Sequence, residues 1–179
     1  MAQNIEQQWR TKAGFLAVVL MNDMGFRCGY VAVGKGHPLH GHDYNVPTDK
    51  LKRVEDGENV GDRGAIPIFC AALSGDDSWR ERPEIVFNVH GSLTYSGDGG
   101  GKYPIEHDGL WWFGYDCGHC DDAPAPGSRL ARCGMVGGVH RSLQYCVEQC
   151  ESLAQQLIDR VKFDTGMPIL PIETSGDGC

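Results

Sequence analysis

The sequence predicts an α+β fold, a mostly antiparallel twisted sheet with one long C-terminal amphipathic helix packed across it. Three features predict this fold. Two β-rich apolar runs flank a short turn near the start of the chain, further strand-like runs follow in its middle, and one long stretch of helical periodicity comes after them. Since a domain typically takes about 100–200 residues, we expect residues 1–179 to form a single domain.

An N-terminal hairpin is predicted for residues 12–33. Two runs rich in β-branched, aromatic and other apolar residues, 15–21 and 26–33, flank a turn that contains Asn, Asp and Gly. The first run is almost entirely apolar, so we expect it to form a central strand. Residues 3–11, which precede the hairpin, are polar and suggest a short helix or a frayed end.

A long polar loop is predicted to follow the hairpin. Residues 34–64 are rich in Gly, His, Pro, Asp and Lys, and a connection of this length is typical of a binding or mobile loop. Residues 66–73 could form a short strand or begin a helix.

The core strands that carry the site are expected in residues 84–116. An apolar run predicts a strand at 84–90, which continues at 93–95 after Gly91. A second run, at 110–116, is heavy in aromatic residues and predicts another strand.

The C-terminal helix is predicted for residues 139–162, and an extended tail for residues 166–179. Apolar residues recur at steps of three and four, which places them on one face of a helix, while charged and amide side chains occupy the rest of the wheel. The apolar face consists of Val139, Leu143, Cys146, Cys150, Leu153, Leu157 and Val161.

Composition excludes several classes of partner. The chain has a formal net charge of −8 and no dense run of Lys or Arg, so we do not expect it to bind duplex nucleic acid. No stretch approaches the roughly 20 apolar residues of a membrane span, and the polar start does not resemble a signal peptide. We therefore expect a cytoplasmic protein with no membrane partner, whose eight cysteines are thiols or metal ligands. Homo-oligomerisation is left open.

Cys117-Gly-His-Cys120 is the tetrapeptide found in disulfide isomerases. Thiol–disulfide chemistry needs the first cysteine at a helix N-terminus, but the residues that follow, Asp-Asp-Ala-Pro-Ala-Pro-Gly, disfavour a helix. Two aspartates would also raise the pKa of a neighbouring thiol. The sequence therefore argues against a redox function.

The same segment suggests a metal site, for which zinc is the cofactor to expect. Cys117, His119 and Asp122 are the predicted ligands. A structural zinc site would instead use Cys117 and Cys120 with Cys133 and either His119 or His140. A catalytic site would use His90, Asp116, His119 and Asp121 or Asp122, and would leave one position for water.

His90, Asp116, His119 and Asp122 are the predicted catalytic residues. His90 ends a predicted strand and precedes a glycine and several hydroxyl side chains, which suits a general base or a phosphate ligand. It could equally be a hydrogen-bonded core histidine. A two-histidine phosphodiesterase, built from His90-Gly-Ser92 and His140-Arg-Ser142, is disfavoured because His140 begins a predicted helix.

Five further side chains are predicted to bind a ligand. A histidine at the end of the hairpin and the hydroxyl groups after His90 could bond to it, and an aromatic side chain of the 110–116 strand could stack on a base. These residues are His37, Thr94, Tyr95, Trp111 and Trp112.

Four blocks of the sequence resemble a family of small bacteriophage proteins. They are Gly29-Tyr-Val, Gly36-His-Pro-Leu, His90-Gly-Ser-Leu-Thr-Tyr-Ser and Trp111-Trp-Phe-Gly-Tyr-Asp-Cys-Gly-His119, and the helix that contains Tyr145 and Glu148 adds to the likeness. Members of the family usually have a glycine where this chain has Ser92, and a small residue where it has Cys120. The family has no settled activity. The resemblance implies a phage accessory protein expressed in the cytoplasm of an infected bacterium.

The function expected from this resemblance is counter-defence. The leading hypothesis is a protein that binds and sequesters a small phosphorylated ligand, such as a nucleotide second messenger of host immunity. In this hypothesis His37, His90 and His119 contact phosphates, Thr94 and Tyr95 add hydrogen bonds, and Trp111 or Trp112 stacks the base. The alternatives are a metal-dependent, phosphodiesterase-like hydrolase of such a nucleotide, and a protein that inhibits a host defence protein by direct interaction.

Overall fold

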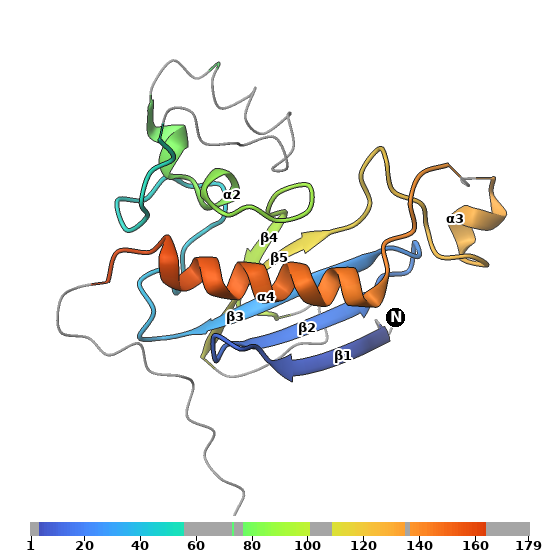
Figure 1. The fold of residues 1–179 in the computed structure, drawn as a ribbon, viewed down its shortest axis with the longest axis horizontal. Coiled ribbons are helices and arrows are strands. Elements are labelled where there is room, and N and C mark those ends of the chain that lie inside the picture. Colours follow the sequence, from blue (N-terminus) through green and yellow to red (C-terminus); the bar gives the residue numbers. More distant parts are fainter. Residues whose placement is uncertain (1–3, 56–72, 74–76, 101–108, 135–136, 164–179) are drawn as a thin grey trace, which may run out of the picture.

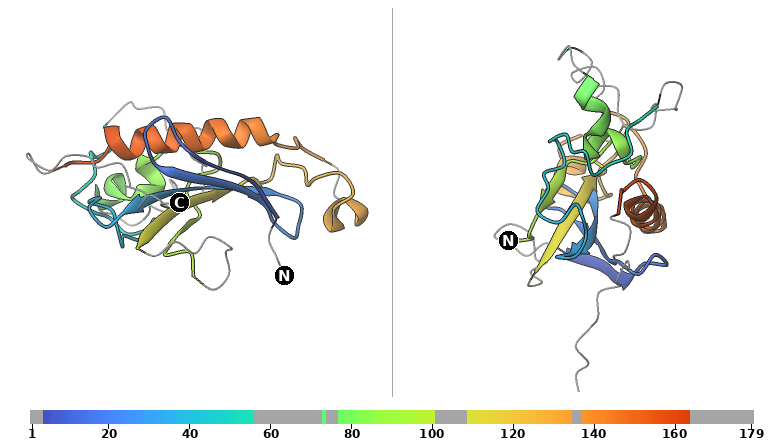
Figure 2. Two further views of the ribbon diagram at one scale, coloured as in Figure 1. Left: turned by 90° about the horizontal axis from the view of Figure 1, so that it is seen from below. Right: turned by 90° about the vertical axis from the view of Figure 1, so that its left-hand side faces the viewer.

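A computed structural model describes residues 4–55, 73, 77–100, 109–134 and 137–163. Within these residues, the frame is a five-stranded antiparallel sheet in the order β1-β2-β3-β5-β4. The long helix α4 (Leu143–Asp159) crosses one face of the sheet (Figures 1 and 2), so the predicted α+β class is confirmed. No helix among the described residues has the length and hydropathy needed to cross a membrane.

The predicted hairpin is present, and it forms the centre of the sheet. Strands β2 (Leu16–Met21) and β3 (Arg27–Gly34) pair in antiparallel register, from Leu16 opposite Ala32 to Met21 opposite Arg27. The turn between them is held by Asn22, whose side-chain oxygen accepts hydrogen bonds from the backbone N–H groups of Met24 and Phe26.

The polar N-terminal segment is a strand, so the prediction of a helix or a frayed end was wrong. Strand β1 (Asn4–Arg10) pairs antiparallel with β2 at the edge of the sheet. An edge strand exposes many of its side chains, which is why a polar sequence is tolerated there. Its Trp9 donates a hydrogen bond to Glu151 of α4 at 2.8 Å, which ties the edge of the sheet to the helix.

The two faces of the sheet carry separate apolar clusters, because successive strand residues point to opposite sides. The face under α4 includes Ala17, Val19, Val31, Val33, Phe113 and Tyr115. The opposite face includes Val18, Leu20, Cys28, Tyr30, Ala32 and Trp112. On β5 (Leu110–Asp116), confirmed as an aromatic strand, this alternation assigns Asp116 to the face opposite α4.

The long helix matches its predicted apolar face but begins later than expected. Ser142 caps its N-terminus by accepting a hydrogen bond from the backbone N–H of Tyr145. Val139, predicted to lie on the apolar face, is outside the helix and 54% exposed. The helical residues buried against the sheet are Cys146, Cys150, Leu153, Ala154 and Leu157.

Residues 84–90 do not form the predicted strand. Pro83 starts a one-turn helix, α2 (Pro83–Val86), and the chain then runs irregularly to His90. The apolar side chains are nevertheless buried, with Val86, Phe87 and Val89 in the cluster under α4. A short apolar run fits a strand or a buried irregular segment equally well, which is why the pattern was misleading.

The remaining elements are short. Strand β4 (Tyr95–Gly97) pairs with β5, two residues later than the predicted start at 93, and η2 (Asp77–Glu81) and α3 (Arg129–Arg132) are single turns. Residues 35–55 form turns and irregular backbone, as predicted for the polar loop, apart from one bridge between Leu51 and Val161. The predictions for 56–72 and for the tail at 166–179 lie outside the described residues.

Ser92 occupies a backbone conformation that favours glycine. Its φ is 88°, its side chain is buried, and its Oγ donates a 2.6 Å hydrogen bond to the backbone carbonyl of Glu84. The hydrogen bond offsets part of the backbone strain that a non-glycine residue has at this φ.

We expect Ser92→Ala to lower the free energy of unfolding by more than Ser92→Gly does. Both variants lose the hydrogen bond to Glu84, but only glycine removes the strain of a positive φ, which costs roughly 1–2 kcal/mol. Chemical denaturation of the two variants beside the parent protein tests this. Equal losses would mean that the backbone at residue 92 is not strained.

Candidate functional site

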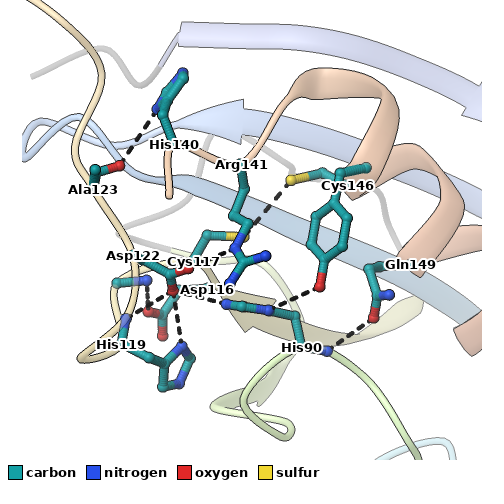
Figure 3. A network of polar contacts seen from close by, with 12 residues as sticks. His90, Asp116, Cys117, His119, Asp122, Ala123, His140, Arg141, Cys146 and Gln149 are labelled. Atoms are coloured by element: carbon teal, nitrogen blue, oxygen red, sulfur yellow. Dashed lines mark hydrogen bonds and ion pairs between the residues drawn. The ribbon is translucent and has the colours of Figure 1, made fainter. Parts of the chain in front are cut away.

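The candidate site forms where three separate segments meet. His90 comes from the loop after α2, His119 and Asp122 from the segment after β5, and Arg141 from the residues just before α4 (Figure 3). Tyr145 lies in the first turn of α4. We call these five residues the Asp122 cluster.

Asp122 is the centre of the cluster, and its side chain is only 1% exposed. Its Oδ1 accepts a 2.7 Å hydrogen bond from Nε of Arg141. Its Oδ2 is bonded to Nε2 of His90 at 2.7 Å and to the backbone N–H of His119 at 3.0 Å. Burial alone would raise the pKa of this carboxyl group, but the hydrogen bonds from Arg141, His90 and His119 outweigh burial and lower it.

His90 is fixed by bonds at both ring nitrogens. An ionised carboxylate only accepts hydrogen bonds, so Nε2 of His90 carries a proton and donates it to Asp122. Nδ1 lies 2.9 Å from the hydroxyl group of Tyr145, which donates to Nδ1 when the ring is neutral. Arg141, Asp122, His90 and Tyr145 therefore form one continuous hydrogen-bonded chain.

His119 lies beside these four hydrogen-bonded residues and has one ring nitrogen without a hydrogen bond. Its Nδ1 is 3.6 Å from Oδ2 of Asp122, too long for a hydrogen bond, and is buried without a partner among the described residues. Its ring packs edge-on against His90, with 5.2 Å between the centroids. Gly91 makes this packing feasible, because a Cβ there would stand 2.0 Å from Cε1 of His119.

The polar side of α4 holds the loop that carries His90. Gln149 accepts a hydrogen bond from the backbone N–H of His90 at 2.9 Å, and Gln156 bonds to both the backbone N–H and the carbonyl of Asn88. These bonds replace the ladder that a strand would have provided at 88–90.

Sequence reasoning missed Arg141, Tyr145 and Gln149, which it assigned to the helix surface or to the family resemblance alone. Tyr145 and Gln149 are spaced four apart and share one face of α4, whereas Arg141 lies just before the capping residue Ser142. What the sequence lacked was any indication that this face meets His90.

His90, His119 and Asp122 form a group that could hold a metal ion. One ligand atom from each lies within 4.8 Å of the others, and two imidazoles with one carboxylate suit zinc. The structure thus puts His90 in the place predicted for Cys117. The thiol of Cys117 is buried against α4, 3.7 Å from Sγ of Cys146, and Cys117 is not part of this group.

The structural zinc site and the redox motif find no support in the geometry. Across the described part of the chain, the grouped candidate ligands include no cysteine. Cys120 and Cys133 are exposed, and the contact to Cys146 together with burial raises the pKa of Cys117. The segment after Cys120 is irregular, as its prolines predicted.

Asp116 and Thr94 lie next to the cluster but face the other side of the sheet. Thr94 donates a 3.0 Å hydrogen bond to Asp116, which also accepts one from the backbone N–H of Gly118. Asp116, Thr94 and Tyr95 line an open pocket of about 910 Å³, together with His119 and Asp122. We call it the sheet pocket. It brings together three of the four predicted catalytic residues with Thr94 and Tyr95, whereas His90 does not line it.

Three predicted ligand-binding residues lie elsewhere. Asp116 is at the end of β5 next to the site, where it pairs with Cys28 at the start of β3. Trp111 and Trp112 are at the other end of β5, where they pair with the last residues of β3. Trp112 is fully buried, and Trp111 donates to the backbone carbonyl of His42. His37 follows that far end and is bonded to the carbonyl of Leu157; burial lowers the pKa of its imidazole to about 4. None of these three lines the sheet pocket.

His140 does not pair with His90 as a two-histidine phosphodiesterase requires. Its Nε2 lies 2.9 Å from a guanidinium nitrogen of Arg27, and its other nitrogen faces the carbonyl of Ala123. Neither His90 nor His140 lies on a strand.

No family model, no curated protein and no solved structure matches this chain. The inference of function therefore rests on the site itself.

We expect Asp122→Asn to lower the free energy of unfolding by about 3 kcal/mol, because it leaves Arg141 without its buried counter-charge. The folded-state pKa of Asp122 lies below its unfolded value of about 3.9. Its contribution is therefore complete above about pH 4 and is lost as the pH falls through the folded-state pKa.

Denaturant unfolding of the metal-free protein between about pH 2 and 7 measures both effects. Asp121→Asn removes a neighbouring but exposed carboxylate and is the matched control. If the two variants lose the same stability, or if Asp122→Asn keeps the acid dependence of the parent, Asp122 does not hold the site together.

Proposed function

We propose that this chain is a metal-dependent hydrolase, in which His90, His119 and Asp122 hold a divalent cation, with zinc the best match. The observation that carries the proposal is the grouping of their three ligand atoms within 4.8 Å beside an open pocket. Three protein ligands leave a position for water, and a bound zinc ion would lower the pKa of that water toward neutrality.

The surroundings of the three residues suit ligand roles. A histidine that binds a metal through one nitrogen usually donates its other N–H to a neighbour. With Nε2 of His90 on the metal instead of bonded to Asp122, Nδ1 would carry the ring proton and donate a hydrogen bond to the hydroxyl oxygen of Tyr145. Arg141 and the backbone N–H of His119 orient the carboxylate of Asp122. The partnerless Nδ1 of His119 is the nitrogen that a cation would satisfy.

The sheet pocket favours hydrolysis over sequestration as the use of this site. Asp116, Asp121 and Asp122 line it, and no lysine or arginine does among the residues the structure describes. Carboxylates repel a phosphate group, so a nucleotide needs a bound cation to enter. Its aromatic wall, which includes Phe26, Tyr30 and Tyr95, suits a flat ring such as a base.

The biological setting follows from the sequence resemblance. We propose a phage-encoded protein that acts in the cytoplasm of an infected bacterium and degrades a nucleotide signal of host defence. Sequestration of the intact nucleotide and inhibition of a host protein by direct contact are the competing functions, and the experiments below separate them.

We expect the protein to bind zinc with one-to-one stoichiometry, and His119→Ala to weaken that binding by more than about 100-fold, since even outer partners of a metal site contribute 10–100-fold. Native mass spectrometry and competition with a chelating dye measure the affinity. His42→Ala removes an imidazole from the opposite end of β5 and is the matched control. Unchanged binding in His119→Ala would remove His119 from the site.

We expect the zinc-loaded protein to convert at least one member of a panel of cyclic and linear nucleotides to products, and a chelator to stop the reaction. Liquid chromatography of the heat-denatured mixture separates the outcomes. A nucleotide recovered intact but bound before denaturation would indicate sequestration. If no nucleotide is bound or cleaved, the nucleotide proposal fails and a host protein becomes the partner to seek.

A further inference from the structure

A second, smaller cavity lies on the α4 side of the Asp122 cluster. Its volume is about 450 Å³, and we call it the α4 groove. It is formed by the loop that ends in His90 and by the first half of the helix, and it shares three residues with the cluster. It is lined by Asn88, Val89, His90, Arg141, Tyr145, Gln149 and Ser152.

The groove presents hydrogen-bond donors that the fold does not use. Arg141 bonds to Asp122 through Nε and lies over the ring of Tyr145, 5.2 Å from its centroid, and its two terminal guanidinium nitrogens have no hydrogen-bond partner among the described residues. Gln149 uses its carbonyl oxygen for the backbone of His90, which leaves its amide nitrogen unpaired within the same part of the chain (Figure 3). Gln156 bonds to the backbone of Asn88, and the side-chain amide of Asn88 has no hydrogen-bond partner among the described residues.

The groove also differs in charge from the sheet pocket. Its lining contains a guanidinium group and no carboxylate, whereas the sheet pocket is lined by three carboxylates and no cationic lysine or arginine among the described residues. Arginine presents its terminal N–H groups as a planar fork that matches phosphate oxygens. These donors fit a ligand that carries several strong hydrogen-bond acceptors on one group.

We propose that the α4 groove is a subsite for a phosphate group, bound by the terminal guanidinium nitrogens of Arg141 and by the side-chain amides of Gln149 and Asn88. This proposal rests on the proposed function in one respect: the ligand that occupies the groove beside His90 is taken to be the substrate of the hydrolase. It specifies a substrate with a phosphate group that does not sit on the metal. His90 and Tyr145 lie in both the groove and the cluster, so such a group would be held next to the reacting centre.

Gln149→Glu tests the subsite with little change to the fold. The variant keeps an oxygen to accept from the backbone N–H of His90 and replaces the amide donor with a negative charge that repels phosphate. Gln155→Glu adds the same charge on the exposed side of α4 and is the matched control. Asn88→Asp makes the same exchange on the opposite wall, where the backbone bonds to Gln156 are unaffected.

Inorganic phosphate and methyl phosphate are titrated into the full chain, free of metal, and followed by NMR of the backbone and side-chain amides. We expect saturable binding that shifts the Gln149 and Asn88 amide signals. Gln149→Glu and Asn88→Asp should each weaken it by about tenfold or more, and Gln155→Glu by less than about twofold. Tighter binding of methyl phosphate would assign the subsite to a phosphoester, and tighter binding of inorganic phosphate to a free terminal phosphate.

The proposal is overturned if phosphate does not saturate the parent protein, or if Gln155→Glu weakens binding as much as Gln149→Glu. Zinc affinity is measured on the same samples and is expected to be unchanged in Gln149→Glu. A protein that binds phosphate in the groove but no zinc would contradict the metal-dependent hydrolase and leave the subsite standing. A protein that binds zinc but no phosphate would contradict the subsite and leave the metal-dependent hydrolase standing.

Discussion

One buried carboxylate sets the geometry of everything around the site. The Asp122 side chain is 1% exposed, and leaving its charge without partners in that position would cost several kcal/mol. Its partners come from three different places: Arg141 just before α4, His90 in a loop, and the backbone of His119 after β5. Each partner satisfies the carboxylate only when its own segment is correctly placed. The segment after β5, the loop and the helix are therefore held in one arrangement by a single group.

The elements with a strong periodic pattern could be predicted from the sequence, and the others could not. The side-chain spacing of the hairpin, the aromatic strand and the helix predicts each of these elements. Strand β1 has no such pattern, since its conformation is set by pairing with β2 rather than by its own residues. The run at 84–90 is apolar because it is buried, but side-chain amides of α4 replace strand partners along its backbone.

Local sequence pointed to the three residues that the structure groups as possible metal ligands, although it named Cys117 in place of His90 as a ligand. His90, His119 and Asp122 were identified because polar residues next to glycines and strand ends are typical of sites. Asp116 lines the sheet pocket with His119 and Asp122, but strand alternation points it away from α4, so it is not one of the three grouped ligands. Cys117, the residue after β5, is buried against Cys146 of α4 and is not one of the grouped ligands. Arg141 and Gln149 reach the site only through the docking of the helix, which no local pattern reports.

The order of the segments along the chain has a consequence for biosynthesis. Within the described residues, the five strands of the sheet are complete by residue 116, whereas Tyr145, which bonds to His90, lies on α4 and Arg141, which bonds to Asp122, lies just before it. As the chain leaves the ribosome, the sheet can form while the loop at 88–90 still lacks Gln149 and Gln156. The nascent protein therefore acquires its framework first and its working centre only when α4 docks. Premature termination before α4 would yield a sheet with an exposed apolar face and no assembled centre.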